Sequence, residues 1–144
     1  MLFFALPMNL FVYGTLLVPQ IWTLVTSDTF PENEEGSLPG YSIRKVKNAS
    51  FPAITHTGKN QDIVPGRLLH KIAPETLRSL DAYEDQFYFR TEVEVSTLKG
   101  EIIAAETYAV SSNTASRILS SESWTLEWFL RNAYEDYWKA MNGN

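Results

Sequence analysis

The sequence predicts an α+β fold in which a mixed, β-barrel-like sheet is flanked by a few helices. The middle of the chain, residues 41–110, holds mostly short strand-like segments, and helical patterns stand on both sides of it. The 144 residues are 44% hydrophobic and 20% charged, which is typical of one globular domain. We therefore treat residues 1–144 as a single domain.

The chain is expected to begin with a strand, a glycine-containing turn and a helix. Residues 10–13 are an apolar and aromatic run that stops at Gly14, which is typical of a strand buried on both faces. Pro19 suits the first turn of a helix, which we expect over residues 19–25.

The apolar start of the chain has the pattern of neither a signal peptide nor a spanning helix. Its first basic residue is Arg44, so a positive n-region is absent, and Pro7 interrupts the apolar stretch. We expect no membrane partner. Translation starts at either Met1 or Met8, and residues 1–9 belong either to the domain or to a disordered extension.

The next segments are expected to be a loop and three strands. Residues 28–40 contain Glu, Pro and Gly without periodicity, which predicts a solvated loop. Strands are predicted at residues 41–46, 51–54 and 63–72, the last one interrupted by Pro65-Gly66.

The second half of the chain predicts a helix and a hairpin. Pro74 opens a short helix that ends near Tyr83. Residues 89–96 alternate between apolar or β-branched and polar side chains, the pattern of a half-buried strand. After a turn at Lys99-Gly100, residues 102–110 supply the return strand.

The C-terminal residues 126–141 carry apolar side chains at helical spacing and predict one amphipathic helix, with Ser123 or Thr125 as its cap. Its aromatic side chains either pack on the barrel or dock a partner. The sequence indicates no oligomeric state.

Charge and composition exclude several classes of protein. The net charge of −5 argues against nucleic acid as a partner, and the basic cluster Arg44-Lys45-Lys47 is expected to be the solvated face of a strand. The chain has no cysteine, which excludes disulfides and suits a cytoplasmic location. His56 and His70 form no metal motif, and we expect strand or surface histidines.

The first candidate site is the segment from Tyr13 to Leu16. A buried strand that ends at Gly14 just before a helix leaves backbone N–H groups free to bind an anion such as a carboxylate. The alternative is that this glycine only forms a turn.

The second candidate is Glu84, which lies among aromatic residues where a helix is expected to meet a strand. Apolar surroundings would raise the pKa of this carboxyl towards neutrality, as a proton shuttle requires. The alternative is a solvated acidic turn in which Asp81 pairs with Arg78 or Arg90.

Five short segments in the same order resemble the γ-glutamyl cyclotransferase-like family, and most closely its small branch of plant avirulence-induced proteins and γ-glutamylamine cyclotransferases. They are similar to the family's YG[ST]L, L.GY, [YF]PAI, V.G.L and LD.[FY]EG..Y.R motifs. These segments are residues 11–16, 38–41, 51–54, 64–69 and 80–90. Five motifs in order are much more specific than any one of them.

The resemblance implies a barrel with a cavity. It also implies that the α-amine of a γ-glutamyl amide or peptide attacks its own side-chain carbonyl, giving 5-oxoproline and a free amine. It makes Glu84 the acid/base residue, with a small γ-glutamyl substrate as partner and neither metal nor cofactor. Residues that match the substrate-binding motifs are Tyr13, Gly14, Thr15, Leu16, Tyr88 and Arg90. Arg90 either binds substrate or braces the site.

Asp85 follows Glu84 where the family usually has glycine. A second carboxylate there would either raise the pKa of Glu84 or displace its backbone. We therefore keep an alternative function: a non-catalytic domain that retains the cavity to bind a small ligand or a protein. The identity of the leaving amine is not encoded in any pattern that we can interpret.

Overall fold

The computed structural model describes residues 6–84 and 86–143. The strands within these ranges are β1 (Met8–Val12), β2 (Asn33–Pro39), β3 (Tyr41–Lys45), β4 (Pro52–His56), β5 (Ile63–Ile72), β6 (Phe89–Thr97) and β7 (Ile102–Ala109). The helices are the 3₁₀ turn η1 (Thr15–Leu17), α1 (Pro19–Thr26), α2 (Pro74–Tyr83), α3 (Ser112–Ile118), α4 (Leu126–Asn132) and α5 (Tyr134–Met141).

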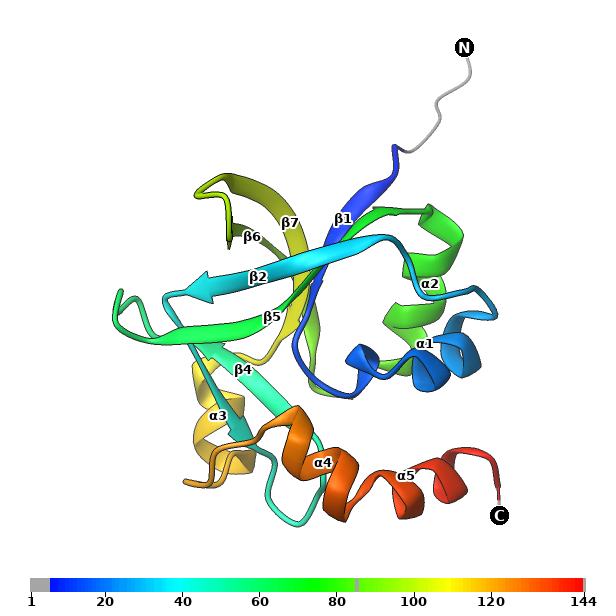
Figure 1. Ribbon diagram of the computed structural model, residues 1–144. Helices are drawn as coiled ribbons and strands as arrows, with labels where there is room; N and C mark the ends of the chain where they lie inside the picture. The colour runs from blue at the N-terminus through cyan, green and yellow to red at the C-terminus, as the bar shows by residue number, and fades with distance from the viewer. Residues whose placement is uncertain (1–5, 85, 144) are drawn as a thin grey trace.

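Five strands close into a barrel in the order β1-β5-β2-β6-β7, while β3 and β4 form a separate two-stranded sheet. The barrel is mixed, because β1 runs parallel to β7 whereas its other neighbour, β5, is antiparallel to it. α1 and α2 lie on one side of the barrel, and α4 and α5 run below it (Figure 1). The predicted α+β fold with a barrel-like sheet and flanking helices is confirmed.

Strand β1 separates two apolar cores because its side chains alternate between its faces. Leu10 and Val12 pack in the core formed with the helices, and Phe11 and Tyr13 pack in the barrel core. The prediction of a first strand buried on both faces is confirmed. This alternation also points the Tyr13 side chain away from α1, at the end of the strand where the chain turns.

The prediction of a solvated loop over residues 28–40 is wrong for its second half. Residues 33–39 form β2, which pairs with β5 along its length and with β6 at Gly36 and Ser37. Only Gly36 and Leu38 are buried in this strand, so its apolar periodicity is too weak to recognise. A Cβ at Gly36 would lie 2.8 Å from Val95 Cγ1, which explains why glycine stands where β2 meets β6.

Strand β5 runs without interruption through Pro65 and Gly66, contrary to the prediction, because both residues pair with β2. Gly66 lies against β1, where an added Cβ would approach Val12 O to 2.3 Å. Met8 pairs with Ile72, so residues 8 and 9 are part of a strand rather than of an extension. Residues 1–5 lie outside the described residues, and both candidate start positions remain open.

The C-terminal segment is two helices instead of the single helix predicted. They are separated at Ala133, whose backbone angles of φ −133° and ψ −18° are not helical. Thr125 caps α4 by accepting a hydrogen bond from the Trp128 amide at 3.1 Å. Phe129 is fully buried in the core with Trp22, so α4 packs against the body of the domain.

The short helix α3 was not predicted.

Polar features of the surface follow the expectations in part. His70 Nε2 lies 2.9 Å from Glu34 Oε2, and His56 packs its ring against Tyr41. Lys45 was expected on a solvated strand face, but its side chain is partly covered, because its Nζ lies 3.7 Å from the centre of the Trp128 ring. No helix in the described part of the chain is long and apolar enough to cross a membrane.

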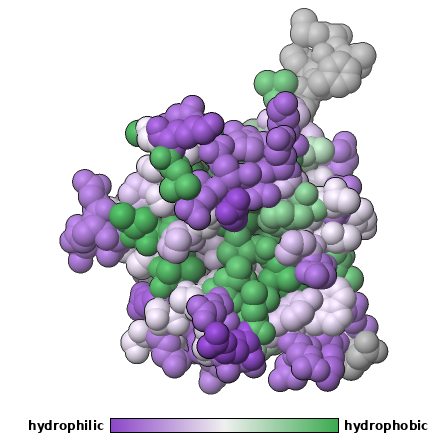
Figure 2. All heavy atoms as spheres, in the orientation of Figure 1, coloured by the Kyte–Doolittle hydropathy of each residue, from purple (hydrophilic) through white to green (hydrophobic). Residues whose placement is uncertain are grey.

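Hydrophobic residues also reach the surface. Figure 2 shows them in a band across the middle of one face, between the barrel strands and α4.

Candidate functional site

A cavity of about 410 Å³ lies where the end of β1, η1, the end of α2, the start of β4 and α5 meet. It brings the segment from Tyr13 to Leu16 together with Glu84 and Tyr88, which are far apart in the sequence. Aromatic side chains form most of the remaining wall. The lining residues include Phe11, Phe51, Pro52, Tyr83, Phe87, Tyr108 and Tyr137.

Glu84 stands at the end of α2, at the edge of the cavity. The helix begins with Pro74 at its first turn and buries Leu77 and Leu80 against the core, as predicted. The Glu84 amide donates to Leu80 O at 2.9 Å, which fixes the backbone of the residue directly after the last helical turn. Burial raises the pKa of its carboxyl from 4.5 to about 7. The group is therefore poised to exchange a proton near neutral pH.

Four tyrosines surround this carboxyl closely enough for its charge to act on them. Burial first, and the negative charge of Glu84 in addition, raise the pKa values of Tyr13, Tyr83, Tyr88 and Tyr108. These phenols therefore stay neutral and act as hydrogen-bond donors.

Hydrogen bonds hold most of these rings in place. The Tyr13 hydroxyl donates to Tyr108 O at 2.6 Å, and the Tyr88 hydroxyl donates to Pro52 O at 2.6 Å. The Tyr108 hydroxyl donates to Asp81 Oδ1, also at 2.6 Å. Because these bonds connect β1, β4, β7 and α2, the walls of the cavity are organised before any ligand binds.

The turn after β1 forms another part of the cavity wall. Leu17 N donates to Gly14 O at 3.0 Å and Val18 N to Thr15 O at 3.1 Å, which creates η1. The amides that begin such a turn have no acceptor within it. A Cβ at Gly14 would lie 3.0 Å from Pro52 Cγ, so glycine lets β4 approach this turn closely. The Thr15 hydroxyl lies 3.3 Å from the Tyr83 hydroxyl and adds a polar group to this wall.

Arg90 is the one predicted site residue that does not line the cavity. Its Nε and Nη2 bind the Asp81 carboxylate at 2.9 and 3.1 Å, and its Nη1 binds Glu106 Oε2. Burial alone would raise the pKa of Asp81, but the hydrogen bonds from Arg90 and Tyr108 lower it. These contacts hold the end of α2 against the barrel strands. The choice between the two roles expected for Arg90 stays a prediction.

Several lining residues were not predicted, and the signals for them differ. Tyr83 directly precedes Glu84 and could have been found from that position. Tyr137 gave no signal, because it is one of many aromatic residues in the C-terminal segment.

Phe51 and Tyr137 also line a neighbouring open groove of about 770 Å³, together with Lys45 and Lys47. Asp85 lies outside the described residues, so its effect on Glu84 stays a prediction.

The sequence is similar to a known protein family and to plant proteins of that family. The family described as γ-glutamyl cyclotransferase, AIG2-like matches residues 10–126. AIG2-like protein C of Arabidopsis thaliana is 32% identical over 130 residues, which cover 90% of this chain and 73% of that protein.

Solved structures share the fold. A solution structure of an Arabidopsis thaliana protein has a TM-score of 0.68 at 25% identity, covering 92% of this chain and 87% of its own. A structure described as γ-glutamyl cyclotransferase has a TM-score of 0.60 at 21% identity, covering 72% of this chain and 66% of its own. The barrel therefore belongs to the class of folds that γ-glutamyl cyclotransferases use. The chain is a member of the γ-glutamyl cyclotransferase, AIG2-like family.

Proposed function

We propose that the protein is a γ-glutamyl cyclotransferase that converts a small γ-glutamyl amide or peptide into 5-oxoproline and a free amine or amino acid. One observation carries this proposal: Glu84, with its pKa raised to about 7, lines the same cavity as the turn from Tyr13 to Leu16. The family membership agrees with it.

The reaction needs a base for the α-ammonium, a proton donor for the leaving nitrogen, and groups that hold the γ-glutamyl chain in place. Glu84 accepts a proton from the α-ammonium of the γ-glutamyl group, and the freed amine attacks the γ-carbonyl carbon to form the ring C–N bond. The amide C–N bond then breaks as the protonated Glu84 gives its proton to the departing nitrogen. The ring nitrogen loses its second proton to the released amine, which leaves as an ammonium ion. Since the attack is intramolecular, holding the chain in a ring-like conformation supplies much of the rate.

The cavity offers groups for the rest of the γ-glutamyl unit. The backbone and the Thr15 hydroxyl on the turn after β1 supply donors for the α-carboxylate, in the cavity that Glu84 also lines. Leu16 and Tyr88 bound the space in which the five-membered ring closes. Phe51 and Tyr137 line both the cavity and the open groove, so we place the leaving group on the side of the cavity that adjoins the groove.

A pKa of about 7 suits the two roles of Glu84. An ordinary glutamate is deprotonated at neutral pH but is too weak a base to take a proton from an ammonium group. Raising the pKa of Glu84 brings it closer to the pKa of the ammonium group. It also keeps the transferred proton on the carboxyl until the amide C–N bond breaks. The absence of cysteine from the sequence is compatible with a cytoplasmic location for this chemistry.

The test is release of 5-oxoproline from γ-glutamyl alkylamines, γ-glutamyl dipeptides and glutathione by the wild type and by Glu84→Gln. We expect at least one substrate to be turned over, and the variant to lose more than about 100-fold in kcat. Glu75→Gln is the matched control, because Glu75 is exposed on the same helix. Turnover that Glu84→Gln leaves unchanged would show that the mechanism is wrong.

The alternative is a domain that binds a small ligand or a protein without turning it over. The replacement of the usual glycine by Asp85 favours it, because Asp85 adjoins the acid/base position. Binding of 5-oxoproline with no turnover of any substrate would support this alternative. In that case Asp85→Gly is the variant that should restore release.

A further inference from the structure

Tyr137 belongs to the cavity although it lies beyond residue 126, where the family match ends. Its hydroxyl is hydrogen-bonded to the Tyr83 hydroxyl, and that hydroxyl lies 3.3 Å from Thr15 Oγ1. A row of three hydroxyl groups therefore joins η1, the end of α2 and α5. Tyr83, the middle member of the row, is also the residue directly before Glu84, the acid/base position.

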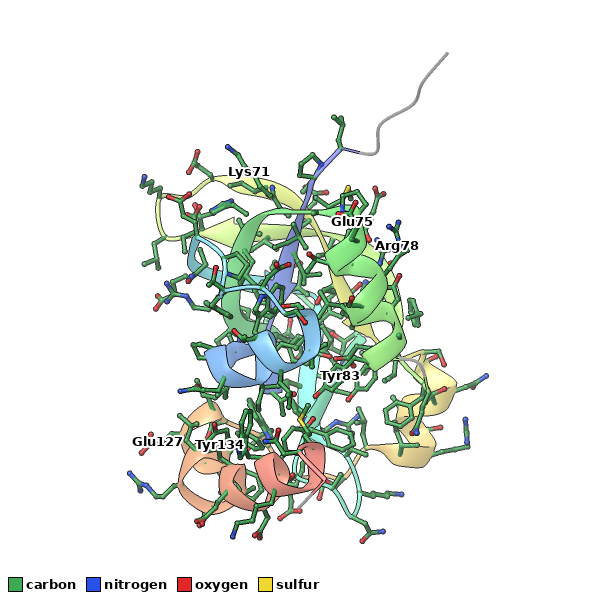
Figure 3. All side chains as sticks on the ribbon, turned by 90° about the vertical axis from the view of Figure 1, so that its right-hand side faces the viewer. Lys71, Glu75, Arg78, Tyr83, Glu127 and Tyr134 are labelled. Carbon is green, nitrogen blue, oxygen red and sulfur yellow. The ribbon has the colours of Figure 1, made fainter. Side chains whose placement is uncertain are left out.

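Packing holds the Tyr137 ring in place. Its ring meets the buried Phe129 ring edge to face, with centroids 5.4 Å apart, and its amide donates to Ala133 O at 3.0 Å. The break at Ala133 starts a new helix and so sets the direction in which Tyr137 projects. Figure 3 shows Tyr83 at the end of α2 that faces the two C-terminal helices.

Counting protons shows that the row has a donor to spare. Each hydroxyl carries one proton, and burial raises the pKa of Tyr83 so that it keeps its proton. Two hydrogen bonds within the row use two of the three protons. The third proton is left at one of the three hydroxyl groups, and Thr15, Tyr83 and Tyr137 all line the cavity. An acceptor in the cavity, such as a carboxylate, would take it.

We propose that Tyr137 is a positioning residue, which orients the Thr15–Tyr83 hydroxyl pair so that the row donates a hydrogen bond to a carboxylate of the γ-glutamyl substrate. This inference rests on the proposed function and assigns α5, outside the matched family segment, to the wall of the active site. Its effect falls on binding of the carboxylate. The proton transfers at Glu84 do not pass through it.

The test uses Tyr137→Phe, which removes one oxygen and keeps the ring that packs on Phe129. We measure kcat and KM for the best γ-glutamyl substrate, and by calorimetry the Kd of 5-oxoproline, which carries the same carboxylate. We expect KM and Kd to rise about 3- to 10-fold, the loss typical of one hydrogen bond, with kcat within about twofold of wild type.

Tyr134→Phe is the matched control, since Tyr134 also contacts the Phe129 ring from α5 but does not line the cavity. It should change neither KM nor Kd. In a Tyr83→Phe background, adding Tyr137→Phe should have little further effect, because the row is already broken.

The inference is overturned if Tyr137→Phe leaves KM and Kd unchanged, or if it lowers kcat alone. It is equally overturned if the wild type does not bind 5-oxoproline. Absence of turnover in the wild type with 5-oxoproline still bound contradicts the proposed function only. The Kd values of 5-oxoproline for Tyr137→Phe and for the control Tyr134→Phe then decide whether Tyr137 positions the row.

Discussion

Glu84 lies close enough to Tyr13 for its negative charge to raise the pKa of that buried phenol, although the two residues are far apart in the sequence. The Tyr13 hydroxyl already donates its proton to Tyr108 O, so it does not donate a hydrogen bond to the Glu84 carboxylate. The carboxyl therefore remains in a poorly solvated environment, and burial raises its own pKa to about 7.

The first prediction concerns the pH dependence of turnover. Glu84 must be deprotonated to accept the ammonium proton, so kcat/KM should rise with pH and reach half of its plateau near pH 7. Steady-state rates at constant ionic strength between about pH 5 and pH 9 test this. A kcat/KM that does not change across this range would argue against Glu84 as the base.

The second prediction concerns stability. The pKa of Glu84 is raised from 4.5 to about 7 in the folded protein, so the native state binds this proton more tightly than the unfolded chain. Stability from this group is therefore complete below its unfolded pKa and is lost as the pH rises to about 7. At pH 8, Glu84→Gln should be more stable than wild type by at most about 3 kcal/mol, and at pH 4 the difference should vanish.

Urea denaturation of both proteins at the two pH values measures this difference. Glu75→Gln, on the exposed face of the same helix, should show no such pH-dependent gain. A Glu84→Gln variant that is less stable than wild type at pH 8 would show that the charged carboxyl is well accommodated.

The third prediction separates bracing from binding at Arg90. Its guanidinium holds Asp81 and Glu106 together outside the cavity. Because these groups are partly exposed, Arg90→Gln should lower the free energy of unfolding by only about 1 kcal/mol. The affinity for 5-oxoproline should stay within about twofold of wild type. A tenfold loss of affinity at unchanged stability would instead make Arg90 a substrate ligand.

The fourth prediction concerns the contact between β1 and β5. A Cβ at Gly66 would lie 2.3 Å from Val12 O and 2.7 Å from Phe11 Cζ, and neither the backbone nor the buried ring can move away easily. Gly66→Ala should therefore cost more than about 3 kcal/mol or prevent folding. Denaturation, or the yield of soluble protein, measures the effect. Ser37→Ala on the neighbouring strand is the control, and it should cost less than about 1 kcal/mol.

Much of the local structure could be predicted because it depends on neighbouring residues. The apolar run before Gly14 predicted β1, the prolines at positions 19 and 74 marked the starts of α1 and α2, and alternation predicted β6. These signals depend on helical or strand periodicity and on caps and turns, all of which act over a few residues. The two segments that supply Glu84 and the turn after β1 were likewise visible as motifs.

Only the tertiary structure decided how these parts meet. β2 is a strand because its backbone pairs with β5 and its Gly36 fits against Val95, contacts that leave little apolar pattern in the sequence. Arg90 does not line the cavity, and two acidic partners from other elements hold its guanidinium. Tyr137 reaches Glu84's neighbour because the chain breaks at Ala133 and Phe129 anchors the helices. The sequence determined the elements and the candidate groups, since these rest on short-range interactions. Which residues line the cavity depends on contacts between distant segments, and these contacts form only when the barrel closes.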